Sequence, residues 1–152
     1  MIVSDVKKAM AEGRFPLILT ERKEHLAVLE KMLKSHVEYM GVLYGGIGIK
    51  ERRKIFDSLM SSDAPKAILA TGAYIGEGFD DPRPDTLFIV MPIAFKGKVV
   101  QYAGRLHRKH HAKTDIRIYD YVDRKVSVLV AMYKKRLKAY KAMGYEIKEG
   151  ET

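Results

Sequence analysis

Short apolar runs alternate with longer amphipathic segments along the whole chain. The runs that we expect to form strands are Pro16–Thr20, Tyr39–Tyr44, Lys66–Thr71, Thr86–Met91 and Ile116–Val122. The segments with apolar residues at helical spacing and charged residues opposite them are Val3–Glu12, Glu21–Ser35, Lys50–Met60, Val99–Arg108 and Lys125–Met143. In the last of these helices the expected inner face is Val126, Leu129, Val130, Tyr133, Leu137 and Tyr140, and Asp123 is placed to cap it.

This alternation of strands and helices predicts a parallel sheet with helices on both faces, joined by right-handed crossovers. Thr86–Met91 is continuously apolar, which is typical of a strand that is covered on both faces. We therefore expect a single α/β domain of three layers over residues 1–152, with a mainly parallel sheet of about five to six strands. Ligands of such sheets bind beyond the carboxyl ends of the strands, where Thr20, Gly45, Thr71 and Pro92 stand.

Composition narrows the class of protein. The 152 residues are enough for one domain that folds alone. The chain has no cysteine, which excludes disulfides and cysteine-ligated zinc or iron–sulfur sites. Neither the apolar core of a signal peptide nor an apolar run near the ~20 residues of a membrane span occurs in the sequence. We therefore expect a cytoplasmic protein without a membrane partner.

The positive charge is concentrated in one part of the chain. Between Gln101 and Ala142 there are twelve lysines and arginines and three aspartates, so this segment carries a charge equal to the chain's +9. A polyanionic partner such as nucleic acid explains such a segment. From charge alone, a solvated basic surface explains it equally well.

Two stretches carry candidate chemistry. Gln101–Arg108 reads QYAGRLHR and, if helical, places Arg105 and Arg108 on one face as forked donors suited to phosphate oxygens. Ile68–Asp80 reads as an apolar strand that opens into a glycine-rich loop ending in a carboxylate, and such glycines let backbone N–H groups approach a ligand. The simpler alternatives are a solvated basic helix face and an ordinary turn closed by an aspartate.

Taken together, these residues form a known pattern. The motif Gln101-x-x-Gly104-Arg105-x-x-Arg108 resembles motif VI of superfamily 2 helicases, and Thr71-Gly-Ala-x-x-Gly76-Glu77-Gly78-x-Asp80 resembles their motif V. Tyr44-Gly45-Gly46 before a helix looks like the segment between motifs IV and V, and Leu17–Thr20 stands where motif IV would. The motifs occur in the family's order over roughly Phe15–Val122. The chain thus resembles the second, C-terminal RecA-like domain of such a motor, with Tyr121-Val-Asp123 and the helix after it similar to the restriction-type and DEAD/DEAH branch.

This resemblance implies roles for individual residues. ATP with Mg²⁺ would bind between this domain and an N-terminal RecA-like domain of the same protein. Arg108 would be the arginine finger, a contribution worth ~10³–10⁵ in rate, with Arg105 as a second phosphate contact and Gln101 near the γ-phosphate. Gly76, Glu77, Gly78 and Asp80 would lie at the nucleotide, where Asp80 accepts from a ribose hydroxyl or holds the arginine helix. Thr71, Gly45, Gly46 and Thr20 would contact a DNA or RNA backbone, with DNA as the first expectation.

Some motifs of a complete motor are missing from the sequence. There is no Gly-x-x-x-x-Gly-Lys-Ser/Thr loop and no Asp-Glu-x-His/Asp run, and Asp80-Asp81-Pro82 does not replace them. These residues hold the phosphates, Mg²⁺ and the attacking water, so we expect no ATP hydrolysis by this chain alone. His107, His110 and His111 lack an accompanying carboxylate or cysteine cluster, so no metal site is expected.

Two other hypotheses stay open at the level of the sequence. One is a non-catalytic nucleic-acid-binding module that keeps the same fold and works without ATP. The other is an unrelated doubly wound domain in which the motifs occur by chance.

Overall fold

The computed structural model describes residues 2–37, 39–60, 65–72, 74, 83–90, 101–104, 115–122 and 124–148, with the side chain of Met60 left aside. The elements in chain order are α1 (Ile2–Ala11), β1 (Pro16–Thr20), α2 (Lys23–Leu33), β2 (Tyr39–Leu43), α3 (Ile49–Met60), β3 (Lys66–Thr71), β4 (Thr86–Ile89), β5 (Arg117–Asp120) and α6 (Ser127–Ala142). Residues 101–104 are also helical. The five expected strands and four of the expected helices are present, and the helix expected over Val99–Arg108 is described only at residues 101–104. β2, β4 and β5 end one to two residues earlier than the apolar runs suggest.

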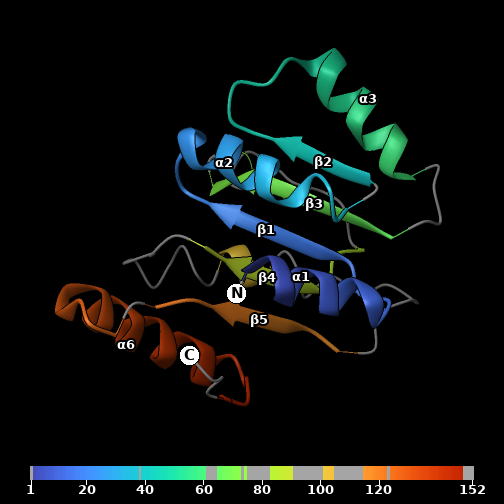
Figure 1. Cartoon of the computed structure of the whole chain (residues 1–152). Helices are drawn as coiled ribbons and strands as arrows, with labels where there is room; N and C mark the ends of the chain where they lie inside the picture. Colours follow the sequence, from blue (N-terminus) through green and yellow to red (C-terminus); the bar gives the residue numbers. More distant parts are fainter. Residues whose placement is uncertain are drawn as a thin grey trace.

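In the described part of the chain, five strands form one sheet in the order β2-β3-β1-β4-β5, and all neighbouring pairs are parallel (Figure 1). This strand order places β1 in the centre of the sheet, and every residue of β1 is buried. β4 is also buried throughout, as its continuous apolar run predicts. The prediction of a mainly parallel α/β sheet is confirmed.

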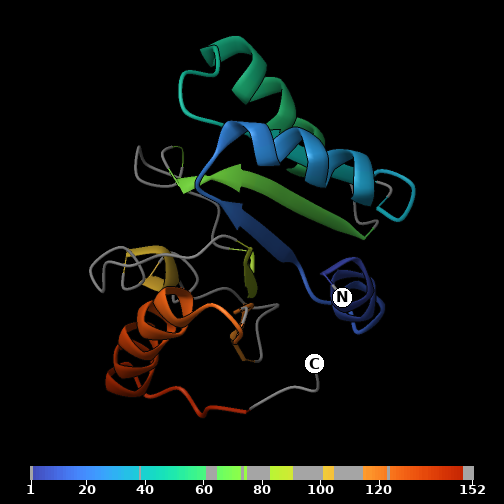
Figure 2. The ribbon, with the colours of Figure 1, turned by 60° about the vertical axis from the view of Figure 1, so that its left-hand side comes forward.

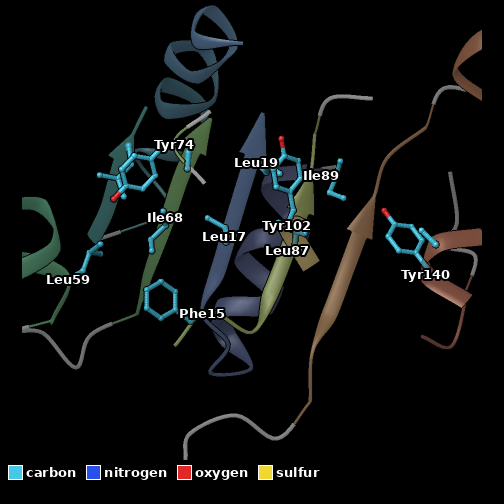
Figure 3. Packing of buried hydrophobic residues seen from close by; sticks show 13 residues of the cluster. Phe15, Leu17, Leu19, Leu59, Ile68, Tyr74, Leu87, Ile89, Tyr102 and Tyr140 are labelled. Atoms are coloured by element: carbon cyan, nitrogen blue, oxygen red, sulfur yellow. The ribbon is translucent and has the colours of Figure 1, made fainter. Parts of the chain in front are cut away.

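Helices cover both faces of this sheet, which gives three layers (Figure 2). Side chains alternate along a strand, so Leu17 and Leu19 of β1 face one core and Ile18 faces the other. The first core includes Leu59 of α3, Tyr102 of the short helix and Tyr140 of α6, several of which are labelled in Figure 3. The second core is closed by α1 and α2. Each fully buried leucine or isoleucine contributes roughly 1.5–3 kcal/mol, so these two cores stabilise the arrangement of strand ends described below.

The inner face of α6 agrees with the expectation in part. Tyr140 is buried and Leu129, Val130, Tyr133 and Leu137 are half-buried, but Val126 is 38% exposed, and the other buried residues are Arg136 and Ala139. Val126 is the N-cap and makes no side-chain capping bond, while Asp123 lies outside the described residues. The helix turns a cation inward because β5 ends in Asp120, whose buried carboxylate needs a counter-charge. Arg136 therefore does not belong to the solvent-facing basic surface.

A second buried arginine fixes the opposite, amino-terminal edge of the sheet. Arg14 donates to Thr86 Oγ1 at 2.6 Å and to the carbonyl of Asp85 at 3.1 Å, and it also forms an ion pair with Asp115. The guanidinium thus joins the segment before β1 to the starts of β4 and β5. β4 and β5 are paired from Thr86 and Arg117 to Ile89 and Asp120, so this anchor at their starts also helps to align their carboxyl ends.

Candidate functional site

The side chain of Thr71 connects the loops that follow β2 and β3. Its hydroxyl oxygen accepts hydrogen bonds from the N–H of Gly45 at 3.2 Å and from the N–H of Tyr74 at 3.4 Å. The residue is 4% exposed. Two accepted bonds leave the hydroxyl proton available for donation. The Gly45 N–H is therefore directed at Thr71, and this hydrogen bond holds the turn after β2 against the end of β3.

Gly46 supplies the exposed part of the same turn. Its φ of +86° lies in the left-handed region, which side chains other than glycine enter at a cost. The turn is closed by a hydrogen bond of 3.2 Å from Ile47 N–H to the carbonyl of Tyr44. The ammonium group of Lys23 lies 4.3 Å from the centre of the Tyr44 ring, which adds a positive charge beside the turn. Backbone N–H groups and a nearby cation are features that suit an anionic ligand.

Thr20 lies beside Thr71, since the two residues are direct partners in the parallel register of β1 and β3. It is fully buried, and its hydroxyl oxygen accepts a long hydrogen bond of 3.5 Å from the N–H of Arg22. Thr20, Thr71, Gly45 and Gly46 are thus gathered at one edge of the sheet, at the carboxyl ends of β1, β3 and β2. Of these four residues, Gly46 is exposed, Gly45 is half-buried and the two threonines are buried.

The short helix of residues 101–104 contacts this edge through Tyr102. The Tyr102 hydroxyl donates a hydrogen bond of 3.0 Å to Oε1 of Glu21, the residue that directly follows Thr20. A Cβ at Gly72 would lie 2.3 Å from the same hydroxyl oxygen, so Gly72 leaves the space that Tyr102 occupies. Burial, together with the neighbouring Glu21 carboxylate, raises the pKa of Tyr102 well above its usual value, and the hydroxyl stays protonated as a donor. Segments that are distant in the chain therefore meet at one hydroxyl group.

The sequence did not predict this junction of Tyr102 with Glu21 and Gly72. Tyr102 stands at an unassigned position of the motif that begins at Gln101, and Glu21 was assigned only to a helix start. A usable signal did exist, because a buried tyrosine hydroxyl needs a partner. Glu21 follows the central strand at the edge where such a partner is required.

Gln101 lies one residue before Tyr102 and points to the other side of the helix. Gln101 and Gly104 are exposed, whereas Tyr102 is 3% and Ala103 0% exposed. Residues three apart share a helix face, so Gln101 and Gly104 mark the outward face of this segment. The remaining site residues predicted from the sequence, Arg105, Arg108, Gly76, Glu77, Gly78 and Asp80, lie outside the described residues.

The described groups at this edge are hydroxyls, backbone N–H groups, an amide, a cation and the Glu21 carboxylate, which accepts from Tyr102. The donors among these groups suit phosphate oxygens. Among the residues with a described position, no group of three or more histidines, aspartates or glutamates is placed to hold a metal. Within the same residues, no helix has both the length and the apolar character needed to cross a membrane.

Comparison with solved structures identifies the fold. The C-terminal part of the Fun30 ATPase domain superimposes with a TM-score of 0.75 at 18% identity, covering 91% of this chain and 46% of that one. T4 UvsW gives 0.72 at 17% identity and coverage of 93% and 31%, and the C-terminal domain of the DEAD-box protein Dbp5 gives 0.63 at 16% identity and coverage of 93% and 79%.

No family model and no curated protein matches the sequence. The chain spans less than half of the length of the first two structures. The likeness therefore concerns the fold, and it agrees with the resemblance that the motifs suggested. This chain has a RecA-like α/β fold, which it shares with the C-terminal part of the Fun30 ATPase domain, with T4 UvsW and with the C-terminal domain of Dbp5.

Proposed function

We propose that this chain is the C-terminal motor domain of an ATP-dependent nucleic-acid helicase or translocase, with DNA as the first expected substrate. The observation that carries the proposal is the junction at Tyr102. Tyr102 belongs to the stretch that resembles motif VI. It contacts Gly72, in the stretch that resembles motif V, and Glu21, which directly follows the stretch that resembles motif IV. A domain of this fold in which those stretches meet is suited to couple a nucleotide to a strand.

In this proposal the site has two parts. Thr71, Gly45, Gly46 and Thr20 form the part that meets the nucleic-acid backbone. The exposed Gly46 turn and the proton of the Thr71 hydroxyl make the contact, while the Gly45 N–H and the buried Thr20 hold the strand ends in place. Gln101, Arg105 and Arg108 face the γ-phosphate of ATP, and Gly76, Glu77, Gly78 and Asp80 lie along the rest of the nucleotide. An N-terminal RecA-like domain supplies the phosphate loop and the Mg²⁺ ligands, because this sequence contains no loop or carboxylate pair for that task.

The decisive experiment uses this chain joined to its ATP-binding domain. Arg108→Ala should lower nucleic-acid-stimulated ATP turnover by about 10³-fold or more, since an arginine finger stabilises charge only in the transition state. Strand affinity should change little. Arg124→Ala, at an exposed position near α6, is the matched control and should keep its turnover. Undiminished turnover in Arg108→Ala would remove the assignment of Arg108.

A second candidate function, favoured by the lysines exposed on α6, is nucleic-acid binding without ATP. It requires that the chain alone binds a strand tightly and with a strong dependence on salt. Binding only at millimolar concentration, or binding that is insensitive to salt, would exclude it.

A further inference from the structure

The helix α6 carries positive charge without any negative charge. Ser127–Ala142 contains four lysines and one arginine and has no aspartate or glutamate. The arginine, Arg136, is buried and paired with Asp120. All four lysines, at positions 134, 135, 138 and 141, are exposed. The exposed charges of this helix are therefore all positive.

Three of these lysines form a stripe along one line of the helix. Lys134, Lys138 and Lys141 are separated by four and three residues, so they lie above one another on the same face. Arg136, Ala139 and Tyr140 lie on the opposite face and are buried. Because Arg136 is held by two hydrogen bonds to Asp120, the rotation of α6 is fixed and the lysine stripe (Lys134, Lys138 and Lys141) faces away from the sheet.

The stripe does not contribute to the stability of the helix. Like charges three or four residues apart destabilise a helix by ~0.2–0.5 kcal/mol a pair. Lys134 with Lys138, and Lys138 with Lys141, are two such pairs. Surface helices usually offset this repulsion with glutamates at the same spacing, and α6 has none. An external polyanion would supply the missing negative charge.

We propose that the lysine stripe is a second contact surface for a nucleic-acid backbone, separate from the strand ends where Thr71 and Gly46 lie. At a rise of 1.5 Å per residue, Lys134 and Lys141 are about 10 Å apart along the helix. The stripe is therefore long enough to lie beside more than one phosphate of a nucleic-acid backbone, which carries a charge on every nucleotide. Lysine ammonium groups act as point charges on phosphates, so this surface binds without reading sequence. The choice of nucleic acid as partner rests on the proposed function.

An anionic membrane is the less suitable partner. A helix that lies on a bilayer inserts an exposed apolar face between the lipids. The face of α6 opposite the stripe is covered by the sheet, with Ala139 at 0% and Tyr140 at 4% exposure. The large apolar side chains exposed at the start of α6 are Val126 and Val128, at 38% and 62%, and they precede the stripe by six residues or more. Two valines offer much less apolar surface than a helix that inserts into a bilayer needs.

The test measures binding of a fluorescent single-stranded oligonucleotide to this chain by anisotropy, over a range of salt concentrations. Lys134→Gln/Lys138→Gln/Lys141→Gln should lower the slope of log affinity against log salt by about 2, since each phosphate contact on a single strand contributes about 0.7. Affinity at low salt should fall at least 10-fold. Lys7→Gln/Lys8→Gln/Lys31→Gln is the matched control, because it removes the same charge from exposed positions on α1 and α2, across the sheet. This control should keep the slope within about 0.5 of the original chain.

The outcomes separate this inference from the proposed function. Equal losses in the two triple variants would overturn the inference, because net charge and not the stripe would then drive binding. An unchanged slope in the stripe variant, together with weaker binding in Thr71→Val, would also overturn it and would leave the proposed function standing. Absence of oligonucleotide binding by the original chain would overturn the inference, whereas the proposed function is tested by ATP turnover in Arg108→Ala. Stripe-dependent binding to vesicles of anionic phospholipid, without binding to the oligonucleotide, would overturn the choice of nucleic acid.

Discussion

Arg136 donates two hydrogen bonds, of 2.7 and 2.8 Å, to the two carboxylate oxygens of Asp120. The side chains are 1% and 7% exposed, and the hydroxyl of Tyr140 donates to the same carboxylate. This ion pair joins α6 to the carboxyl end of β5, and so it places the last helix relative to the edge of the sheet that holds the candidate site.

Arg136→Met should lower the free energy of unfolding by about 3–5 kcal/mol, because it leaves the Asp120 carboxylate buried without its cation. Arg136→Met/Asp120→Leu should lose less, since removing both charges also removes the cost of burying them. Urea denaturation measures both values. A double variant that is less stable than the single variant would contradict this account of the pair.

Alkaline pH should destabilise the protein through its buried tyrosines. Burial raises the pKa of Tyr102, Tyr121 and Tyr140 well above the usual value near 10, and carboxylates beside each hydroxyl raise it further. Burial also raises the pKa of Tyr145 to about 12. A raised pKa in the folded state gives stability that is complete below about pH 10 and is lost as pH rises above it, because the unfolded chain then releases protons that the folded chain keeps.

The measurement is tyrosinate absorbance and circular dichroism in parallel across an alkaline titration. Ionisation of the buried tyrosines should coincide with loss of structure. Ionisation of all nine tyrosines near pH 10 in a chain that stays folded would refute the prediction.

Acid pH should act at the other edge of the sheet, through Asp115. Hydrogen bonding from Arg14 lowers the pKa of this carboxyl below its usual value of 3.8. A lowered pKa gives stability that is present above the unfolded value and is lost as pH falls through the folded value. The free energy of unfolding should therefore fall below about pH 4, and Asp115→Asn should make this fall shallower. Asp57→Asn, at an exposed carboxyl on α3, serves as the control and should leave the fall unchanged.

Much of the fold could be predicted from the sequence because its strands are short, apolar and separated by amphipathic helices. β1 and β3 have the bounds that their apolar runs suggest. The ends of β2, β4 and β5 differ because Tyr44, Val90 and Val122 are apolar but lie beyond the last paired residues. Apolar character favours burial, and it does not show at which residue the pairing of two strands stops.

The site was harder to predict in its polar contacts. The positions of Thr71 and Gly45 follow from strand order, yet their mutual hydrogen bond depends on loop geometry that no sequence pattern specifies. Arg136 looked like one more surface cation, because a helical period does not say which residue meets a buried carboxylate. Polar pairs between residues distant in the chain depend on the tertiary structure, so the sequence alone does not predict them.

Gly72 offers the sharpest test of the junction at the strand ends. A methyl group there would lie 2.3 Å from the Tyr102 oxygen and 3.2 Å from the ring carbon that carries it. Gly72→Ala should therefore cost about 1–3 kcal/mol of stability through overpacking. Tyr102→Phe should cost about 0.5–1.5 kcal/mol, since it removes the hydrogen bond to Glu21. In Gly72→Ala/Tyr102→Phe the oxygen that the methyl group meets is absent, so the loss should be at least about 1 kcal/mol smaller than the sum of the single losses.

Gly104→Ala is the control for this cycle. Gly104 is exposed at a helical position where a Cβ would meet nothing within 4 Å, so the substitution should be neutral or stabilise by up to about 1 kcal/mol. Urea denaturation of the four variants gives the coupling energy directly. Additive losses would mean that Gly72 is glycine for a reason other than Tyr102, such as the close approach of a ligand to its backbone. A clear coupling would instead make Gly72 the space that lets the helix of Gln101 dock on the ends of β1 and β3.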